Sequence, residues 1–70
     1  MEILVFKTNL NNTSHINKVK PALNRHPFIK DWNVDLQDCD KILRVVTDNI
    51  ASNEIEKIIL NTGYECKELK

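Results

Sequence analysis

The sequence predicts an α+β fold, a βαββαβ sandwich in which a four-stranded antiparallel sheet carries two helices on one face. Two short stretches have apolar residues at helical spacing, and four others either alternate between apolar and polar residues or are short apolar runs. Their order is strand, helix, strand, strand, helix, strand. Polar turn residues separate these stretches. The chain has 70 residues, of which 41% are hydrophobic and 29% charged. That length and balance indicate one globular domain spanning 1–70.

The first half of the chain opens with a strand and a helix. Apolar residues fill most of 3–7, and the Asn-rich run 8–12 then ends that strand. Apolar residues at helical spacing follow, and Thr13 or Ser14 is the expected helix cap. The helix should stop before His26, because a residue that precedes proline avoids the helical region.

The next stretch predicts a β-hairpin. Residues 29–36 alternate as a half-buried strand, the mostly polar run 37–40 makes the turn, and 41–47 form the following strand. Trp32 shares the parity of Leu36. We therefore expect Trp32 to face the helices and to be largely buried.

The last part of the chain predicts a second helix and a final strand. Ser52 is the expected N-cap, and Ile55 and Ile59 lie on the inward stripe of the helix. Gly63 stands where a left-handed residue ends a helix. A short strand over 64–69 completes the predicted fold.

Charge and cysteine content limit the function classes. Lys plus Arg and Asp plus Glu each number 10, so the formal charge is zero, which argues against nucleic acid or an anionic membrane as the partner. No apolar run approaches the roughly 18 residues that a membrane span requires. We expect a cytoplasmic protein with Cys39 and Cys66 as free thiols.

The pattern resembles the heavy-metal-associated domain of copper chaperones and metal-transporting ATPases, over nearly the whole chain. In that family the first strand ends in Met-x-Cys-x-x-Cys. Here Lys7 stands at the methionine position, and Asn9 and Asn12 stand at the two cysteine positions. The Gly63-Tyr64 pair is also similar to the family. The resemblance implies a ferredoxin-like arrangement.

The departure from the family motif predicts that this loop has no soft-metal site and needs no cofactor. Thiolates suit Cu(I) and Zn(II), whereas Asn9 and Asn12 offer neutral, hard amide oxygens. His15 is the remaining candidate ligand, because imidazole binds borderline ions. It lacks obvious ligand partners nearby in sequence, so an ordinary surface histidine is the simpler interpretation.

The sequence carries no enzyme signature. There is one glycine, hence no glycine-rich phosphate loop, and no nucleophile with an adjacent base stands out. We predict a non-catalytic domain that serves as a protein-interaction module. The alternatives are a metal carrier with atypical ligands and a regulatory module for a small ligand.

Strand alternation suggests where a partner would bind. On the first and third strands, we expect the face away from the helices to carry Leu4, Phe6, Ile42 and Val46 as one exposed apolar patch. This patch would mediate docking of a partner protein or homodimerisation. The stems of Arg44 and Lys67 could instead cover it, which would leave it as ordinary surface.

Overall fold

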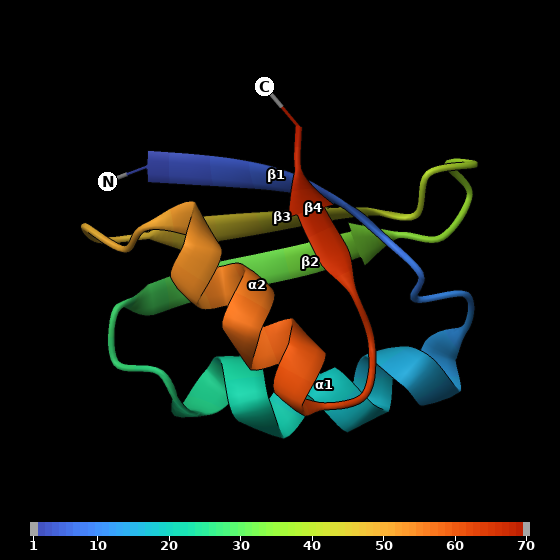
Figure 1. The fold of residues 1–70 in the computed structure, drawn as a ribbon, viewed down its shortest axis with the longest axis horizontal. Coiled ribbons are helices and arrows are strands. Elements are labelled where there is room, and N and C mark those ends of the chain that lie inside the picture. The colour runs from blue at the N-terminus through green and yellow to red at the C-terminus, as the bar shows by residue number, and fades with distance from the viewer. Residues whose placement is uncertain (1, 70) are drawn as a thin grey trace.

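The computed structural model describes residues 2–69 and follows the predicted order of elements (Figure 1). None of the helices within these residues is both long and apolar enough to cross a membrane. The elements are β1 (Glu2–Thr8), α1 (Thr13–Arg25), β2 (Ile29–Asp35), β3 (Ile42–Thr47), α2 (Ser52–Asn61) and β4 (Cys66–Glu68).

The strands form one antiparallel sheet in the order β2-β3-β1-β4, and the helices lie against one of its faces (Figure 1). In the β1–β3 register Leu4 lies opposite Val45 and Phe6 opposite Leu43. Directly opposed residues point to the same side of a sheet. The helix side of β1 and β3 therefore carries these four residues.

The hydrophobic core lies between the sheet and the helices. Its buried members come from β1, the β1–α1 loop, both helices, β3 and the β3–α2 loop, and Trp32 and Val34 of β2 pack against them. The buried members are Phe6, Leu10, Val19, Leu23, Leu43, Val45, Ile50, Ile55 and Ile59.

Trp32 faces the helices as predicted, but it is only partly buried. Its indole Nε1–H donates to Asn24 Oδ1 of α1 at 2.9 Å. Strand β2 is an edge strand, so one flank of the ring stays open to solvent.

The helix caps differ from the sequence prediction. Asn12, and not Thr13 or Ser14, is the N-cap of α1, because Asn12 has an extended backbone and its Oδ1 accepts the His15 N–H at 3.0 Å. Ala51 and not Ser52 precedes α2, and no side chain caps that helix.

The C-terminal end of α2 matches the prediction at Gly63. Its φ is 95°, which is the left-handed region that glycine enters freely. Its N–H donates to the Leu60 carbonyl at 3.0 Å.

The predicted apolar patch combined residues from both faces of the sheet. Leu4 and Phe6 point to the helix side, where Phe6 is fully buried in the core and Leu4 packs against it. The face away from the helices, which we call the open face, carries Ile3 opposite Val46 on these strands. The assignment failed on β1 because this inner strand is apolar on both faces, and alternation alone then gives no direction.

The two faces of β1 should respond differently to an added charge. We expect Phe6→Lys to abolish the fold, because a lysine ammonium would lose its hydration in an apolar core. We expect Phe6→Ala to lower the free energy of unfolding by about 3–5 kcal/mol. Urea titration followed by circular dichroism measures both effects.

Ile3→Lys is the matched control, because Ile3 is 66% exposed on the open face. It should fold and melt close to the unsubstituted chain. Cooperative, near-normal melting of the Phe6→Lys chain would contradict the observed placement of β1.

Candidate functional site

Two connections meet the β1–α1 loop where β1 ends. One is the hairpin between β2 and β3, whose Asp40 carbonyl accepts the Thr8 N–H at 3.1 Å. The other is the α2–β4 connection, whose Glu65 carbonyl accepts the Asn9 N–H at 3.3 Å. Segments distant in sequence are therefore joined at the loop for which the sequence predicted a lost metal motif.

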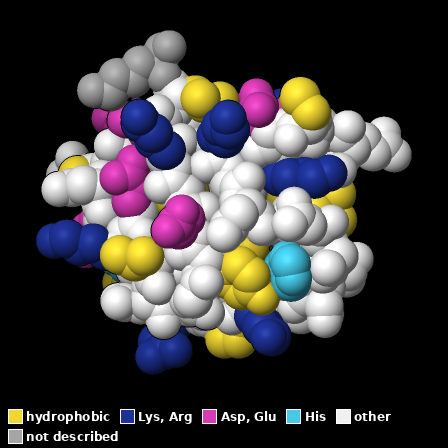
Figure 2. Space-filling model, turned by 45° about the vertical axis from the view of Figure 1, so that its right-hand side comes forward, with side chains coloured by type: hydrophobic (Ala, Val, Ile, Leu, Met, Phe, Trp, Pro, Cys, Tyr) yellow, Lys and Arg dark blue, Asp and Glu magenta, His cyan; other side chains and the backbone are white. Residues whose placement is uncertain are grey.

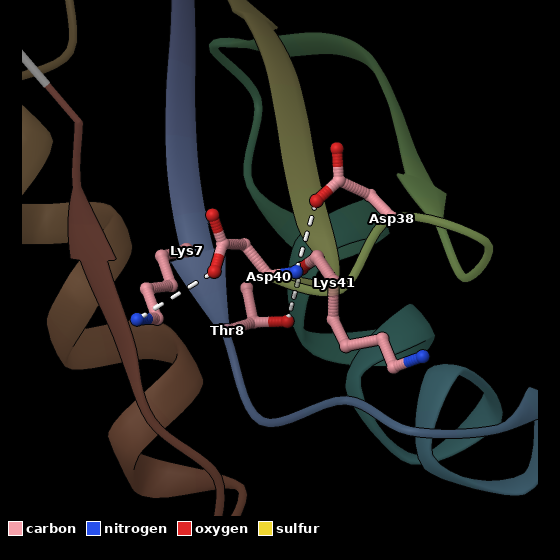
Figure 3. A network of polar contacts seen from close by, with 5 residues as sticks. All are labelled: Lys7, Thr8, Asp38, Asp40 and Lys41. Carbon is pink, nitrogen blue, oxygen red and sulfur yellow. Dashed lines mark hydrogen bonds and ion pairs between the residues drawn. The ribbon is translucent and has the colours of Figure 1, made fainter.

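Thr8 fixes the start of this loop. Its hydroxyl donates to the Lys41 carbonyl at 2.6 Å (Figure 3). The same oxygen accepts the Leu10 N–H at 3.2 Å. The residue is buried. Thr8 was not predicted as a functional residue, because its core-side position follows only from the pairing of β1 with β3 and not from alternation along β1.

Lys7 and Asp40 form a second contact between β1 and the hairpin, with Lys7 Nζ 3.6 Å from Asp40 Oδ1 (Figure 3). The two side chains are 59% and 45% exposed. Solvent screens such a pair, so it contributes little to the free energy of unfolding.

Asn9 connects the β1–α1 loop to the α2–β4 connection. Its Oδ1 accepts the Glu65 N–H at 2.9 Å. Together with the bond from the Asn9 N–H to the Glu65 carbonyl, this makes a two-way link between the segments. The side-chain oxygen of Asn9 is therefore already hydrogen-bonded to a backbone N–H group.

His15 lies over the same loop. Its Nδ1 accepts the Asn11 N–H at 3.1 Å, which places the proton of the neutral ring on Nε2. The Asn12 Nδ2 atom lies 3.4 Å from Nε2. Because both groups are donors in this tautomer, we read that approach as a contact and not as a hydrogen bond. The ring also lies against Tyr64, with centroids 4.8 Å apart.

A different group of potential ligands occupies the hairpin. Within residues 2–69, Asp38, Cys39 and Asp40 bring two carboxylates and a thiol within 4.8 Å of one another. Asp38 Oδ1 accepts the Asp40 N–H at 2.9 Å, which tightens the turn. This run was predicted as a turn, and the convergence of its ligand atoms was not predicted.

The cysteines are free and differ in environment. Cys39 is exposed in the hairpin, whereas Cys66 is half-buried on β4 and packs against the core. Burial, and secondarily the Glu56 carboxylate, raises the pKa of the Cys66 thiol from 9.0 to about 12. Cys66 is therefore a protonated thiol at neutral pH.

The surface at this end has no dominant charge. Figure 2 brings the right-hand side of Figure 1 forward and shows basic, acidic and hydrophobic side chains interspersed among uncharged ones. This arrangement gives no strong field for attracting a highly charged ligand.

The predicted site residues thus lie in three regions. Asn9, Asn12 and His15 lie together in and beside the β1–α1 loop. Ile42 and Val46 lie on the open face, where Ile42 is 7% exposed and Val46 is half-buried, while Leu4 and Phe6 lie on the other side of the sheet.

No family model matches the chain, and no curated protein matches it in sequence. Solved structures do match. The yeast copper transporter domain Ccc2a is 17% identical, with a TM-score of 0.84 over 100% of this chain and 97% of that one. A copper-binding domain from HMA7, a P-type ATPase, is 20% identical, with a TM-score of 0.85 over 100% and 96%. The first domain of the human copper chaperone for SOD1 is 23% identical, with a TM-score of 0.79 over 94% and 89%.

The fold is ferredoxin-like. The chain has the four-stranded antiparallel sheet and the two helices of these copper-related domains, as the sequence predicted. At these sequence identities the similarity establishes the fold alone.

The cap at Asn12 gives a stability prediction. We expect Asn12→Ala to lower the free energy of unfolding by about 1 kcal/mol, because the His15 N–H loses its acceptor. Asn12→Asp keeps an acceptor and should retain most of the stability. Equal urea midpoints for the alanine variant and the unsubstituted chain would show that the cap contributes nothing.

The raised pKa of Cys66 gives a pH prediction. Above pH 9 the thiol ionises in the unfolded chain but stays protonated in the folded one, so unfolding is favoured as the pH rises toward 12. Urea midpoints on both sides of pH 9 measure this decline. Cys66→Ala should show a shallower decline, because the thiol whose pKa differs between the folded and unfolded chain is gone. An identical decline would contradict this assignment.

Proposed function

We propose that this chain is a non-catalytic domain of the heavy-metal-associated type whose β1–α1 loop has lost its soft-metal ligands, and that it acts as a protein-interaction module. The observation that supports this most directly is that the polar side chains of the loop are hydrogen-bonded to backbone N–H groups. The ferredoxin-like fold shared with copper chaperone and transporter domains supports the family assignment.

The side-chain oxygens of Asn9 and Asn12 favour the proposal that the loop has lost its soft-metal site. If Asn9 and Asn12 stand where the family has cysteines, two anionic sulfurs have been replaced by neutral oxygens. Both oxygens already accept backbone N–H groups, from Glu65 and from His15. An incoming ion would have to break these bonds in exchange for weak, hard ligands that Cu(I) does not prefer.

The tautomer of His15 supports the same proposal. A histidine that ligates a metal through one ring nitrogen usually donates the other N–H to an acceptor. Here a metal on Nε2 would require a proton on Nδ1, directly opposite the Asn11 N–H. Two donors would then face each other, so this environment opposes metal ligation at Nε2.

The hairpin cluster favours the alternative of a carrier with atypical ligands. A thiolate and two carboxylates suit Zn(II) better than Cu(I). Asp40 would need to leave Lys7, and that exposed ion pair is weak. We rank this alternative second. The cluster supplies three ligand groups, whereas a closed zinc site has four, and its thiol Cys39 is exposed to solvent.

The proposed location is the cytoplasm. The free thiols of Cys39 and Cys66 are consistent with a reducing compartment.

Metal titration followed by NMR tests the proposal. We expect no saturable shift of the amides of residues 8–15 with stoichiometric Cu(I), in competition with a thiol chelator. Saturable shifts there would overturn the proposal. Shifts of residues 38–40 with Zn(II) that Cys39→Ser removes would favour the second candidate.

A gain-of-function variant tests the alignment. Asn9→Cys with Asn12→Cys, in a Cys39→Ser background, should bind Cu(I) in the loop, because two thiolates replace the amides. The single variants Asn9→Cys and Asn12→Cys in that background are the controls and should bind much more weakly. A folded double variant without Cu(I) binding would count against the correspondence with the family motif.

A further inference from the structure

The open face of the sheet carries charges of opposite sign on its two sides. The registers place Asp31 and Asp35 on this face of β2, beside β3. Lys7 of β1 and Lys67 of β4 are directly opposed on the same face at the other side. Because β2 and β4 are the outer strands, the face is acidic along one edge and basic along the other.

Aliphatic side chains fill much of the space between these charges. Ile3 of β1 is 66% exposed, and Val46, directly opposite on β3, is half-buried. Leu69 is 44% exposed and joins β1 through its N–H bond to the Val5 carbonyl at 2.9 Å. An exposed group of aliphatic residues with charged edges is typical of a protein contact surface.

The charges of the two edges do not pair within one chain. Strand β3 separates β2 from β1, so their backbones lie about 10 Å apart. Within residues 2–69 the carboxylates of Asp31 and Asp35 form no ion pair, and neither does the Lys67 ammonium. Lys7 pairs with Asp40 of the hairpin, at 3.6 Å. Lys67 therefore faces a like charge across the strands and has no carboxylate partner among the described residues.

A second copy of the chain complements this charge pattern. In a two-fold dimer both partners use the same surface, so the surface must contain both signs of charge. The midline of the sheet runs between β3 and β1. A two-fold axis along this midline, parallel to the strands, lays β2 of one copy over β4 of the other and β3 over β1. An axis across the strands would lay β2 over β2 and bring carboxylates together, so charge selects the first axis.

The registers specify which charged residues meet about this axis. Asp35 lies opposite Ile42 across β2 and β3, and Lys67 lies opposite Lys7 across β4 and β1. The β1–β3 register brings these two pairs into one row across the sheet. The axis then places Asp35 of each copy over Lys67 of the other. Stacked sheets lie about 10 Å apart, a distance that an aspartate and a lysine side chain span together.

The other rows place aliphatic groups against one another. Val46 meets Ile3 of the second copy, and the stem of Arg44 meets Val5. The Arg44 guanidinium needs no partner from the second copy. The two carboxylates of β2 are its diagonal neighbours, because Asn33 between them lies opposite Arg44, and a long side chain reaches such neighbours.

We propose that the open face is a homodimer interface, in which two copies pack face to face about an axis parallel to the strands and Asp35 of each copy pairs with Lys67 of the other. This inference rests on the proposed interaction function and specifies the partner as a second copy of the chain. A four-stranded face this short buries on the order of 400 Å² per copy, at the low end for specific interfaces. The dimer is therefore weak and forms at high protein concentration.

Charge exchange tests the proposal, in a Cys39→Ser background that excludes a disulfide between copies. Sedimentation velocity at concentrations up to about 1 mM measures the dissociation constant. We expect Asp35→Lys and Lys67→Glu each to weaken self-association at least about tenfold, because each puts like charges together at both symmetric contacts. An equal mixture of the two variants should associate about as strongly as the parent chain, because opposite charges then meet at both contacts.

Two variants serve as controls. Asp35→Asn keeps an acceptor for the Gln37 N–H and removes only the charge, so it should weaken association less than Asp35→Lys does. Lys20→Glu reverses an exposed charge on α1 and should leave association unchanged. Circular dichroism checks that every variant is folded.

The outcomes separate this proposal from the proposed function. A parent chain that stays monomeric at about 1 mM would overturn the dimer. A mixture that associates no better than the single variants would do the same, as would amide shifts on dilution that are confined to the helices. These results would leave a different protein as the partner of the domain, whereas Cu(I) binding in the β1–α1 loop would overturn the proposed function and not the dimer.

Discussion

The buried hydroxyl of Thr8 is the constraint on which the loop end of the molecule depends. A buried polar group costs free energy when it lacks a hydrogen bond, and this one bonds to Lys41 of the hairpin and to Leu10 of the loop. It sits where β1 leaves the sheet, so it sets the point from which the β1–α1 loop starts. Leu10 is itself fully buried in the core, and the loop is therefore anchored from both sides.

The polar side chains that follow Thr8 satisfy backbone groups. Asn9 bonds to Glu65, Asn12 caps α1, and His15 accepts from Asn11. A thiol is a weak hydrogen-bond acceptor, so cysteines at positions 9 and 12 would not support the loop in this way before an ion binds. Here the amide oxygens of Asn9 and Asn12 stabilise the loop without an ion, which is the physical reason for favouring an interaction role over a carrier role.

Much of the fold could be predicted because its signals are local. The helix periods, the hairpin turn and the left-handed Gly63 depend on neighbours in sequence. The two faces of β1 were harder to assign from sequence, because Ile3, Leu4, Val5 and Phe6 are all apolar. Only the pairing of β1 with β3 shows which of these side chains face the helices. The Asn-rich run 8–12 was predicted to end the first strand, but the contacts of Thr8 with Lys41 and of Asn9 with Glu65 could not be predicted, since their partners lie 33 and 56 residues away.

Strand β1 contributes side chains both to the start of the β1–α1 loop and to the open face, yet the two sets are independent. Its helix-side residues Leu4, Phe6 and Thr8 hold the core and the loop, while Ile3, Val5 and Lys7 face the opposite side. Alternation along a strand lets one set change without altering the other. Loss of soft ligands from the loop would therefore leave the open face intact, and a domain of this type could keep a docking function after its metal chemistry had gone.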